Sequence, residues 1–387
     1  MQIFGVFAPE RERLLSYFKQ FKQGKGGLIV YLALIGLVLG GICFACIFLL
    51  GHGHTINTSS QVPWGLQIST YVYFALVSGG CIFTNFIGNM FFHEKYKPLA
   101  SRVIFMGLIT AIAGFASLAS ELGHVERMYM FMISPNPTSP MFWMSVWYTA
   151  DITILLVEYI NIQQNRHSKA MLYASFIIPI ITYCSLGSLF GAVGTMPYYY
   201  SSLLPIYFLF SGFLSGNALC AIIAAFESKK SGNAKLIKPF MRMQKIALAS
   251  VFVLTFCRII IGLSSNLSGY EVFRETFFQN VIFGIGGALV APFMILMYRR
   301  TVGALILSSL LVLGTQFMAR LDLVVEGFRV PVFRVYDMPE RISYFPSVFE
   351  FLVVVASVSI VVLVYVVCEK TGLFEIAGKE THQHERH

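Results

Sequence analysis

Residues 103–122, VIFMGLITAIAGFASLASEL, and residues 141–162, MFWMSVWYTADITILLVEYINI, decide the fold class. Each run is apolar over about 20 residues, the length that an α-helix needs to cross the hydrocarbon core of a bilayer. Both runs nevertheless carry acids, because Glu121 closes the first and Asp151 and Glu158 lie inside the second. A charge near the bilayer centre costs roughly 2.5–3.5 kcal/mol on insertion scales, so such side chains face a protein interior or a wet cavity. This helix pair is therefore where we expect function.

The composition places the whole chain in the polytopic membrane class. Of 387 residues, 56% are hydrophobic and only 12% are charged, and the mean hydropathy is +0.71. The net charge of +9 would suit a nucleic-acid-binding protein. Its Lys and Arg residues instead follow the connections on one side of the membrane, so we expect membrane lipid around the chain and no nucleic-acid partner.

The sequence predicts an all-α protein with ten transmembrane helices. The predicted spans are 28–50, 64–91, 103–122, 141–162, 169–190, 203–226, 246–265, 272–297, 302–321 and 347–368. Similar stretches, FFHEK at 91–95 and FESKK at 226–230, end apolar runs four spans apart. This echo suggests two four-helix bundles, spans 2–5 (64–190) and spans 6–9 (203–321), flanked by spans 1 and 10.

The charge distribution predicts the orientation. Of the 28 Lys and Arg residues, 21 fall in the termini and in every second connection, whereas the other connections hold 5. Because cytoplasmic loops are enriched in Lys and Arg, both termini should be cytoplasmic. We therefore expect a cytoplasmic segment 1–27 with no cleavable signal, a transmembrane domain 28–368 and a cytoplasmic tail 369–387. The protein should be a multi-pass component of a bacterial or archaeal cytoplasmic membrane.

The fourth span carries its polar residues on one stripe. Trp147, Asp151, Leu155 and Glu158 recur at i, i+4, i+8 and i+11, which places both carboxyls on the same helix face. Such a stripe could pass a proton through the membrane. Alternatively, Asp151 pairs with Arg258 of the seventh span and Glu158 reaches the cytoplasmic interface. The spacing leaves both interpretations open.

The histidines and cysteines predict no haem, iron–sulfur cluster or metal site in this chain. His52, His54 and His124 lie outside or at the outer edge of the spans, and His93 and His167 are cytoplasmic, so no two can face each other as haem ligands inside the bilayer. The seven cysteines lack the clustered spacing of a metal site, and the one CxxC lies within an apolar helix.

Four short motifs, in order along the chain, give a family resemblance. They are Pro63-Trp64-Gly65, Glu121-Leu122-Gly123-His124 with Arg127, Ser185-Leu186-Gly187-Ser188, and Phe226-Glu227. In this order and spacing the chain resembles the NrfD/polysulfide reductase integral membrane subunit family, with a ten-span length closest to its HybB-like branch. The resemblance covers roughly spans 2 to 9.

The resemblance implies a quinone-interacting membrane subunit of a multi-subunit respiratory oxidoreductase. Menaquinone or another quinone near the periplasmic face would exchange electrons with a docked ferredoxin-like iron–sulfur subunit. That subunit would connect to a molybdopterin, hydrogenase or multihaem cytochrome subunit. The implied catalytic residues are His124, Asp151 and Glu121. The expected quinone-binding residues are His124, Asp151, Trp147, Tyr183 and Ser185, and the expected proton pathway runs through Asp151, Glu158 and Arg258.

A proton-coupled secondary transporter is the alternative. Two similar bundles with intramembrane charges are also transporter features, and an anionic substrate could bind near Arg258 and Asp151. A transporter should function alone, whereas a quinone subunit should copurify with iron–sulfur or haem proteins and be inert without them. A purely structural membrane anchor is a third, weaker interpretation.

Overall fold

The computed structural model describes residues 27–374 apart from 167, 194–195, 197, 266–269 and 330–340, together with Leu15, Ser16 and Lys19. Every regular element in these residues is helical. Ten helical segments are long and apolar enough to cross a membrane, which confirms the all-α, ten-span prediction. They are α3 (Leu28–Leu50), two arms of α5 (Leu66–His93 and Tyr96–Glu121), α7 (Pro140–Gln163), α8 (Lys169–Gly191), α9 (Leu204–Ser231), α10 (Ile237–Ser264), η2 with α13 (Asn280–Tyr298), α14 (Val302–Arg329) and α15 (Val348–Lys370).

The second and third spans form one tight helical hairpin, α5 (Leu66–Glu121), broken only at Phe92 (φ −135°, ψ 24°). Its arms run antiparallel, because Ser78 Oγ donates to the Gly107 carbonyl at 2.8 Å and Ser117 Oγ donates to the Gln67 carbonyl at 3.0 Å. The third span begins at Tyr96, whereas the sequence predicted that it begins at residue 103.

Three further helices are longer than predicted, since hydropathy detects only the part of a helix that lies in hydrocarbon. Helix α10 begins at Ile237 rather than 246, α9 continues to Ser231, and α14 continues to Arg329 rather than 321. The added turns are amphipathic. On α10, for example, Lys238 and Arg242 are exposed whereas Phe240 is buried.

The eighth span differs in kind from the predicted single helix 272–297. Two short helices, α11 (Glu271–Glu275) and α12 (Phe277–Gln279), lead into the π-helix η2 (Asn280–Val290), which continues as α13 (Ala291–Tyr298). Three of the eleven π-helical residues are glycine. A π-helix is rare beyond one turn and frequently marks a functional site.

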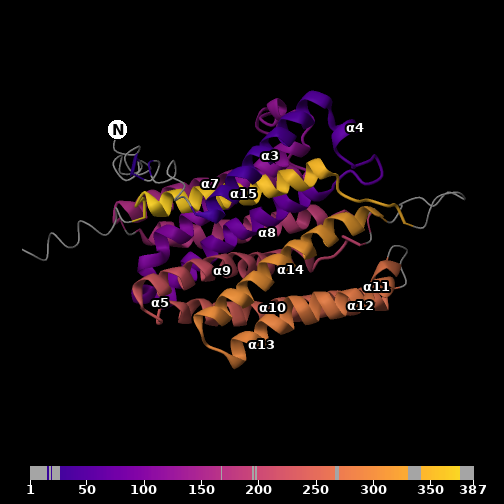
Figure 1. The fold of residues 1–387 in the computed structure, drawn as a ribbon. Coiled ribbons are helices and arrows are strands. Elements are labelled where there is room, and N and C mark those ends of the chain that lie inside the picture. Colours follow the sequence, from indigo (N-terminus) through magenta and orange to yellow (C-terminus); the bar gives the residue numbers. More distant parts are fainter. Residues whose placement is uncertain are drawn as a thin grey trace, which may run out of the picture.

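The centre of the molecule is the crossing of α5 and α9 (Figure 1). Gly80 of α5 meets Gly216 of α9 backbone to backbone, and a Cβ at either position would overlap the other helix. Next to this crossing, the thiols of Cys81 and Cys220 lie 3.6 Å apart. The crossing joins the two predicted four-helix bundles through their first helices, and the division into two bundles stays a prediction.

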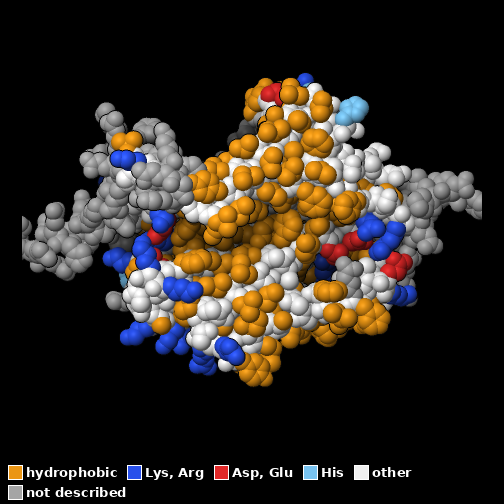
Figure 2. Space-filling view, in the orientation of Figure 1, with side chains coloured by type: hydrophobic (Ala, Val, Ile, Leu, Met, Phe, Trp, Pro, Cys, Tyr) orange, Lys and Arg blue, Asp and Glu red, His pale blue; other side chains and the backbone are white. Residues whose placement is uncertain are grey.

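The first and last spans cover one face of this centre (Figure 1). Helices α3 and α15 pack antiparallel, since Gly36 lies against Ser359 whereas Gly40 lies against Leu352. The end of α15 is thus on the same side as the start of α3. In the face shown in Figure 2, most Lys and Arg side chains lie at one end of a broad apolar surface, and a smaller group lies beside Asp and Glu side chains at the other end. This arrangement is compatible with the predicted orientation, which stays a prediction.

Candidate functional site

Helix α7 presents its two acids to the protein interior. Asp151 is 1% exposed and Glu158 is 6% exposed, and Leu155 between them is fully buried. The stripe packs against α5 and α8, while Trp147 is half-buried. At 1.5 Å per residue, the two acids are about 10 Å apart along the helix axis. We call the group of polar residues around Asp151 the upper site and the group around Glu158 the lower site. Both are formed by the first half of the chain.

The upper site is a group of buried polar atoms that have no hydrogen-bond partner in the described part of the chain. Tyr148 of α7 and Tyr183 of α8 are both buried, and both lie close enough to Asp151 for its charge to act on them. Within the described residues, Asp151 Oδ1 and both tyrosine hydroxyls have no hydrogen-bond partner. Buried polar groups are normally hydrogen-bonded, and leaving one unpaired costs about 1–3 kcal/mol. The upper site therefore has unused capacity to donate to and accept from a ligand.

Helix α5 forms the opposite wall of the upper site. The Tyr71 ring lies 6.2 Å from the Tyr148 ring, and Phe115 of the second arm is also 6.2 Å from Tyr148. One turn before Tyr71, the Gln67 side chain is fully buried, and neither its Nε2 nor its Oε1 has a described partner. The Tyr183 hydroxyl lies against Gly79, where any Cβ would overlap it.

The structure does not bring the three expected catalytic residues together. His124 follows α5 on the outer surface with 64% of its side chain exposed, and its Nδ1 is 2.8 Å from Glu126 Oε1. Hydrogen bonds from its own backbone and from His124 lower the pKa of Glu126. Glu121 ends α5, and its electrostatic neighbours are Glu350 and Tyr344 rather than Asp151. Of the three, only Asp151 belongs to the upper site.

Tyr344 closes this half of the molecule at the end where α5 begins. Its hydroxyl accepts from the Leu66 amide at 2.8 Å and donates to Glu350 Oε2 at 3.0 Å. Burial and the nearby Glu350 raise the pKa of Tyr344, so the hydroxyl stays a neutral donor. Glu350 also completes a capping box with Ser347 at the start of α15. This network fixes the start of α5 above the upper site.

Two expected quinone-binding residues, Trp147 and Ser185, are half-buried on α7 and α8. The backbone carbonyl of Trp147 accepts a hydrogen bond from Thr182 Oγ1 at 3.2 Å, which ties α7 to α8. Tyr183, next to Thr182, is the expected residue that the structure places most fully inside.

The lower site surrounds Glu158 with residues that the sequence analysis did not single out. Asn85 Nδ2 donates to Glu158 Oε1 at 2.5 Å, and the buried Tyr96 hydroxyl donates to Asn85 Oδ1 at 3.0 Å. Asn89, one turn further along α5, also donates to Asn85 at 3.1 Å. Two asparagines four residues apart in an apolar span were the available signal for this network.

Arg258 lies apart from both sites, next to a different acid. Its guanidinium carbon is 4.9 Å from the Tyr198 ring centre and 5.6 Å from that of Phe273, and it lines a cavity together with Asp322. In the described part of the chain, no ion pair joins Asp151 to any Arg or Lys. The suggested pairing of Asp151 with Arg258 is therefore not observed.

No group of three or more His, Cys, Asp or Glu side chains among the described residues could hold a metal ion. The polar atoms gathered at the upper site are hydroxyl, amide and carboxylate groups from separate helices. These groups suit the hydrogen bonding of a neutral polar head better than they suit metal ligation.

Known proteins similar to this chain include integral membrane subunits of oxidoreductases. The chain is 24% identical to the Hdr-like menaquinol oxidoreductase integral membrane subunit of Archaeoglobus fulgidus, over 90% of this chain and 94% of that protein. It is 23% identical to a selenate reductase subunit of Mesobacillus selenatarsenatis, over 85% of this chain and 89% of that protein. A protein of Halobacterium salinarum named as a dimethyl sulfoxide reductase membrane subunit is 28% identical over 36% of this chain and 33% of that protein.

The family match covers most of the membrane domain. The family described as polysulphide reductase, NrfD, matches residues 54–331, a range that holds every span except α3 and α15 at the two ends. With its ten apolar helices, the protein is a multi-pass component of the cytoplasmic membrane. The chain belongs to the NrfD/polysulphide reductase family of integral membrane subunits.

Proposed function

We propose that this chain is the quinone-interacting membrane subunit of a respiratory oxidoreductase complex. The observation that carries the proposal is the upper site, where Asp151, Tyr148 and Tyr183 hold buried polar atoms that have no partner among the described residues, inside an apolar helix bundle. The names of two relatives, a menaquinol oxidoreductase subunit and a selenate reductase subunit, support a redox role over the transporter alternative.

In this proposal a menaquinol head lies between α5, α7 and α8. Asp151 accepts a proton from one hydroxyl of the quinol as two electrons leave, and the proton of the other hydroxyl leaves through the outer mouth of the site. The hydroxyls of Tyr148 and Tyr183 fix the ring orientation. His124 and Glu121 act at the outer mouth, where a released proton reaches solvent. Trp147 and Ser185 line the edge. A docked iron–sulfur subunit on the periplasmic side takes the electrons and passes them to a further redox subunit.

A finer proposal concerns proton translocation. Glu158, Asn85 and Tyr96 form a buried hydrogen-bonded group below Asp151 on the side of the termini. A proton moving between Asp151 and Glu158 would cross about 10 Å of the bundle. We propose that these two acids, and not Arg258, carry the pathway in the first half of the chain.

The proposal is tested with the native complex in mild detergent, measured for quinol-dependent reduction of copurifying redox centres. Asp151→Asn keeps the size of the side chain but removes the base, and loss of a general base lowers rates about 10²–10⁴-fold. Glu275→Gln is the control, because Glu275 is an exposed carboxylate that pairs with Arg341 at 3.3 Å, and such surface pairs contribute little. An intact Asp151→Asn complex with the wild-type rate would refute the assignment.

A further inference from the structure

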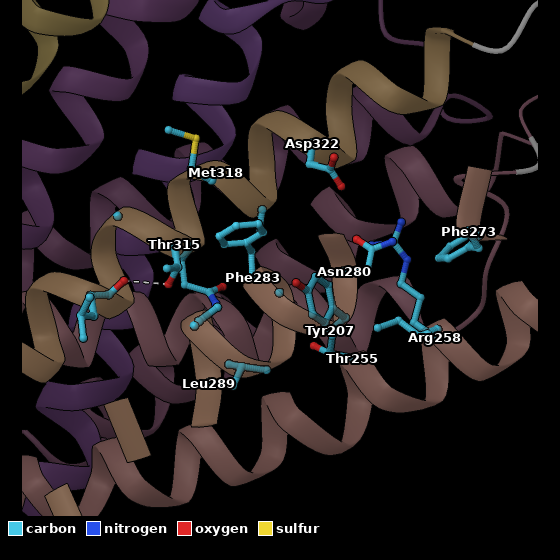
Figure 3. A pocket seen from close by; sticks show the side chains of 18 of the residues that line it. Tyr207, Thr255, Arg258, Phe273, Asn280, Phe283, Leu289, Thr315, Met318 and Asp322 are labelled. Atoms are coloured by element: carbon cyan, nitrogen blue, oxygen red, sulfur yellow. Dashed lines mark hydrogen bonds between the residues drawn. The ribbon is translucent and has the colours of Figure 1, made fainter. Parts of the chain in front are cut away.

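A cavity of about 610 Å³ lies in the other half of the molecule, between α10, η2 and α14 (Figure 3). Tyr207 of α9 forms its inner wall, and none of the residues of the upper or lower site lines it. The volume is within the roughly 300–1,000 Å³ range of ligand sites. Its residues have no part in the proposed quinone chemistry.

The cavity opens sideways toward the position of the lipid chains. Phe283, Leu310 and Met318 line it and are also 70%, 55% and 61% exposed on the outside of the helices. Gly284 and Gly287 of the π-helix line it as well. A Cβ on Gly284 would meet no atom within 4 Å, and one on Gly287 would meet only the Ile282 carbonyl of its own helix at 3.8 Å. The π-helix thus leaves apolar space that protein atoms do not fill.

One end of the cavity is polar. Figure 3 shows Arg258 rising from α10 toward Asp322 of α14, with Asn280 and Phe273 beside it. Arg258 Nη2 is buried and has no hydrogen-bond partner in the described structure. The hydrogen-bond donor to Asp322 Oδ2 is the Tyr198 hydroxyl, at 3.3 Å. The guanidinium therefore has a donor available to a ligand.

The local charge favours an anion. Behind Tyr207, Arg320 is 1% exposed and lies over the rings of Tyr207 and Phe208 at 4.9 and 4.8 Å. It donates to Ser211, and its Nη1 has no described partner. Glu326, the other acid close to Asp322, already pairs with Arg329 and Arg341. Among the described residues, Asp322 is thus the carboxylate left to balance both Arg258 and Arg320, and one positive charge remains uncompensated. Buried charges are costly unless they are paired, so an anionic occupant would be stabilised here.

The depth of the polar end matches a lipid head group. Helix α10 has 28 residues and so spans about 42 Å, against about 30 Å of hydrocarbon. Arg258 is six residues, or about 9 Å, before the end of α10. The amphipathic turns at 237–245 account for the excess length at the other end of α10, so the Arg258 backbone lies about 9 Å inside the hydrocarbon boundary. Its long side chain extends from there toward the phosphate level.

We propose that this cavity binds one anionic phospholipid from the leaflet at the Arg258 end. Its phosphate accepts from the Arg258 guanidinium, and the upper part of one acyl chain lies along Gly284 and Gly287. The bound lipid would fill the gap between α10, η2 and α14 and so hold the π-helical span in place. The site requires no redox partner.

The test measures retained lipid. The protein is placed in phosphatidylcholine nanodiscs containing phosphatidylglycerol, and lipid kept after release from the disc is identified by native mass spectrometry. Wild type should keep one phosphatidylglycerol. Arg258→Gln removes the charged donor and should weaken retention about tenfold or more. Gly287→Leu fills the apolar part and should do the same while leaving Arg258 in place.

Matched controls exclude general effects. Arg242→Gln removes a charge from an exposed position on the same helix, and Gly303→Leu adds the same side chain at a glycine with nothing within 4 Å outside the cavity. Both should retain the lipid as wild type does. Wild-type retention in Arg258→Gln and Gly287→Leu, or retention of phosphatidylcholine or a quinone in place of phosphatidylglycerol, would overturn the proposal. Because the measurement needs no electron transfer, its failure is separable from failure of the quinone assignment.

Discussion

Replacing Asn85 with leucine should destabilise the membrane domain by about 2–6 kcal/mol, because it leaves two buried polar groups unpaired at about 1–3 kcal/mol each. The groups are Glu158 Oε1, which loses a donor at 2.5 Å, and the Tyr96 hydroxyl, which loses an acceptor at 3.0 Å. Glu158 is 6% exposed and Tyr96 is fully buried, so water does not replace either bond. Leucine has the branched shape of asparagine and is not smaller, so the substitution creates no cavity.

The assay is thermal unfolding in detergent, followed with a thiol-reactive dye that reports exposure of the buried Cys43, Cys81 and Cys220. At about 2.1 cal/mol/K of unfolding entropy per residue, a chain of 387 residues loses about 1.2 °C per kcal/mol, so the expected loss is about 2.5–7.5 °C.

Asn89→Leu is the matched control for Asn85→Leu. It is the same substitution on the same helix, at a half-buried residue that makes one bond to Asn85 at 3.1 Å. Its cost should be about 0.5–1.5 kcal/mol, the usual net value of one hydrogen bond. Equal shifts in the two variants would refute the reasoning that Asn85 holds the lower site together.

Two further predictions concern the helix crossing and proton movement. Gly216→Ala should destabilise the folded protein by about 1–3 kcal/mol, since the added Cβ would overlap the backbone at Gly80. The control Gly41→Ala, which has open space around it, should be neutral or stabilising by about 0.5–1 kcal/mol. Equal melting temperatures of the two variants would contradict the close crossing. Glu158→Gln should keep quinol-driven electron transfer but abolish proton movement in proteoliposomes containing a pH dye, and unchanged coupling would remove Glu158 from the pathway.

The sequence predicts most of the architecture because span length and charge placement are local properties. All ten spans are present, and the shared stripe of Asp151 and Glu158 is buried because 3.6-residue periodicity already determines which face they occupy. Hydropathy did not predict that the helix resumes directly after the break at Phe92. The charges of Lys95 and Lys97 lower the mean hydropathy of residues that are nevertheless helical.

The site was harder to predict because it depends on which helices touch. Arg258 and Asp151 are both intramembrane charges, and only the packing shows that Arg258 faces Asp322 across a different cavity. His124 lies just beyond the end of α5, where the 3₁₀ turn Val125–Arg127 directs the chain and no periodicity predicts its direction. Asn85 is marked in the sequence only by Asn89 four residues later, and Tyr96 carries no distinctive signal. Both gain their role from the closeness of the α5 arms to α7.

Photo-crosslinking of the native complex with an azido-quinone, followed by peptide mapping, tests the central claim most directly. The quinone assignment predicts label on α7 near Tyr148 and Asp151 and on α8 near Tyr183, and less label when excess menaquinone competes. Label confined to η2 or to residues 310–322 of α14 would contradict it, because the quinone would then occupy the cavity lined by Arg258 and Asp322.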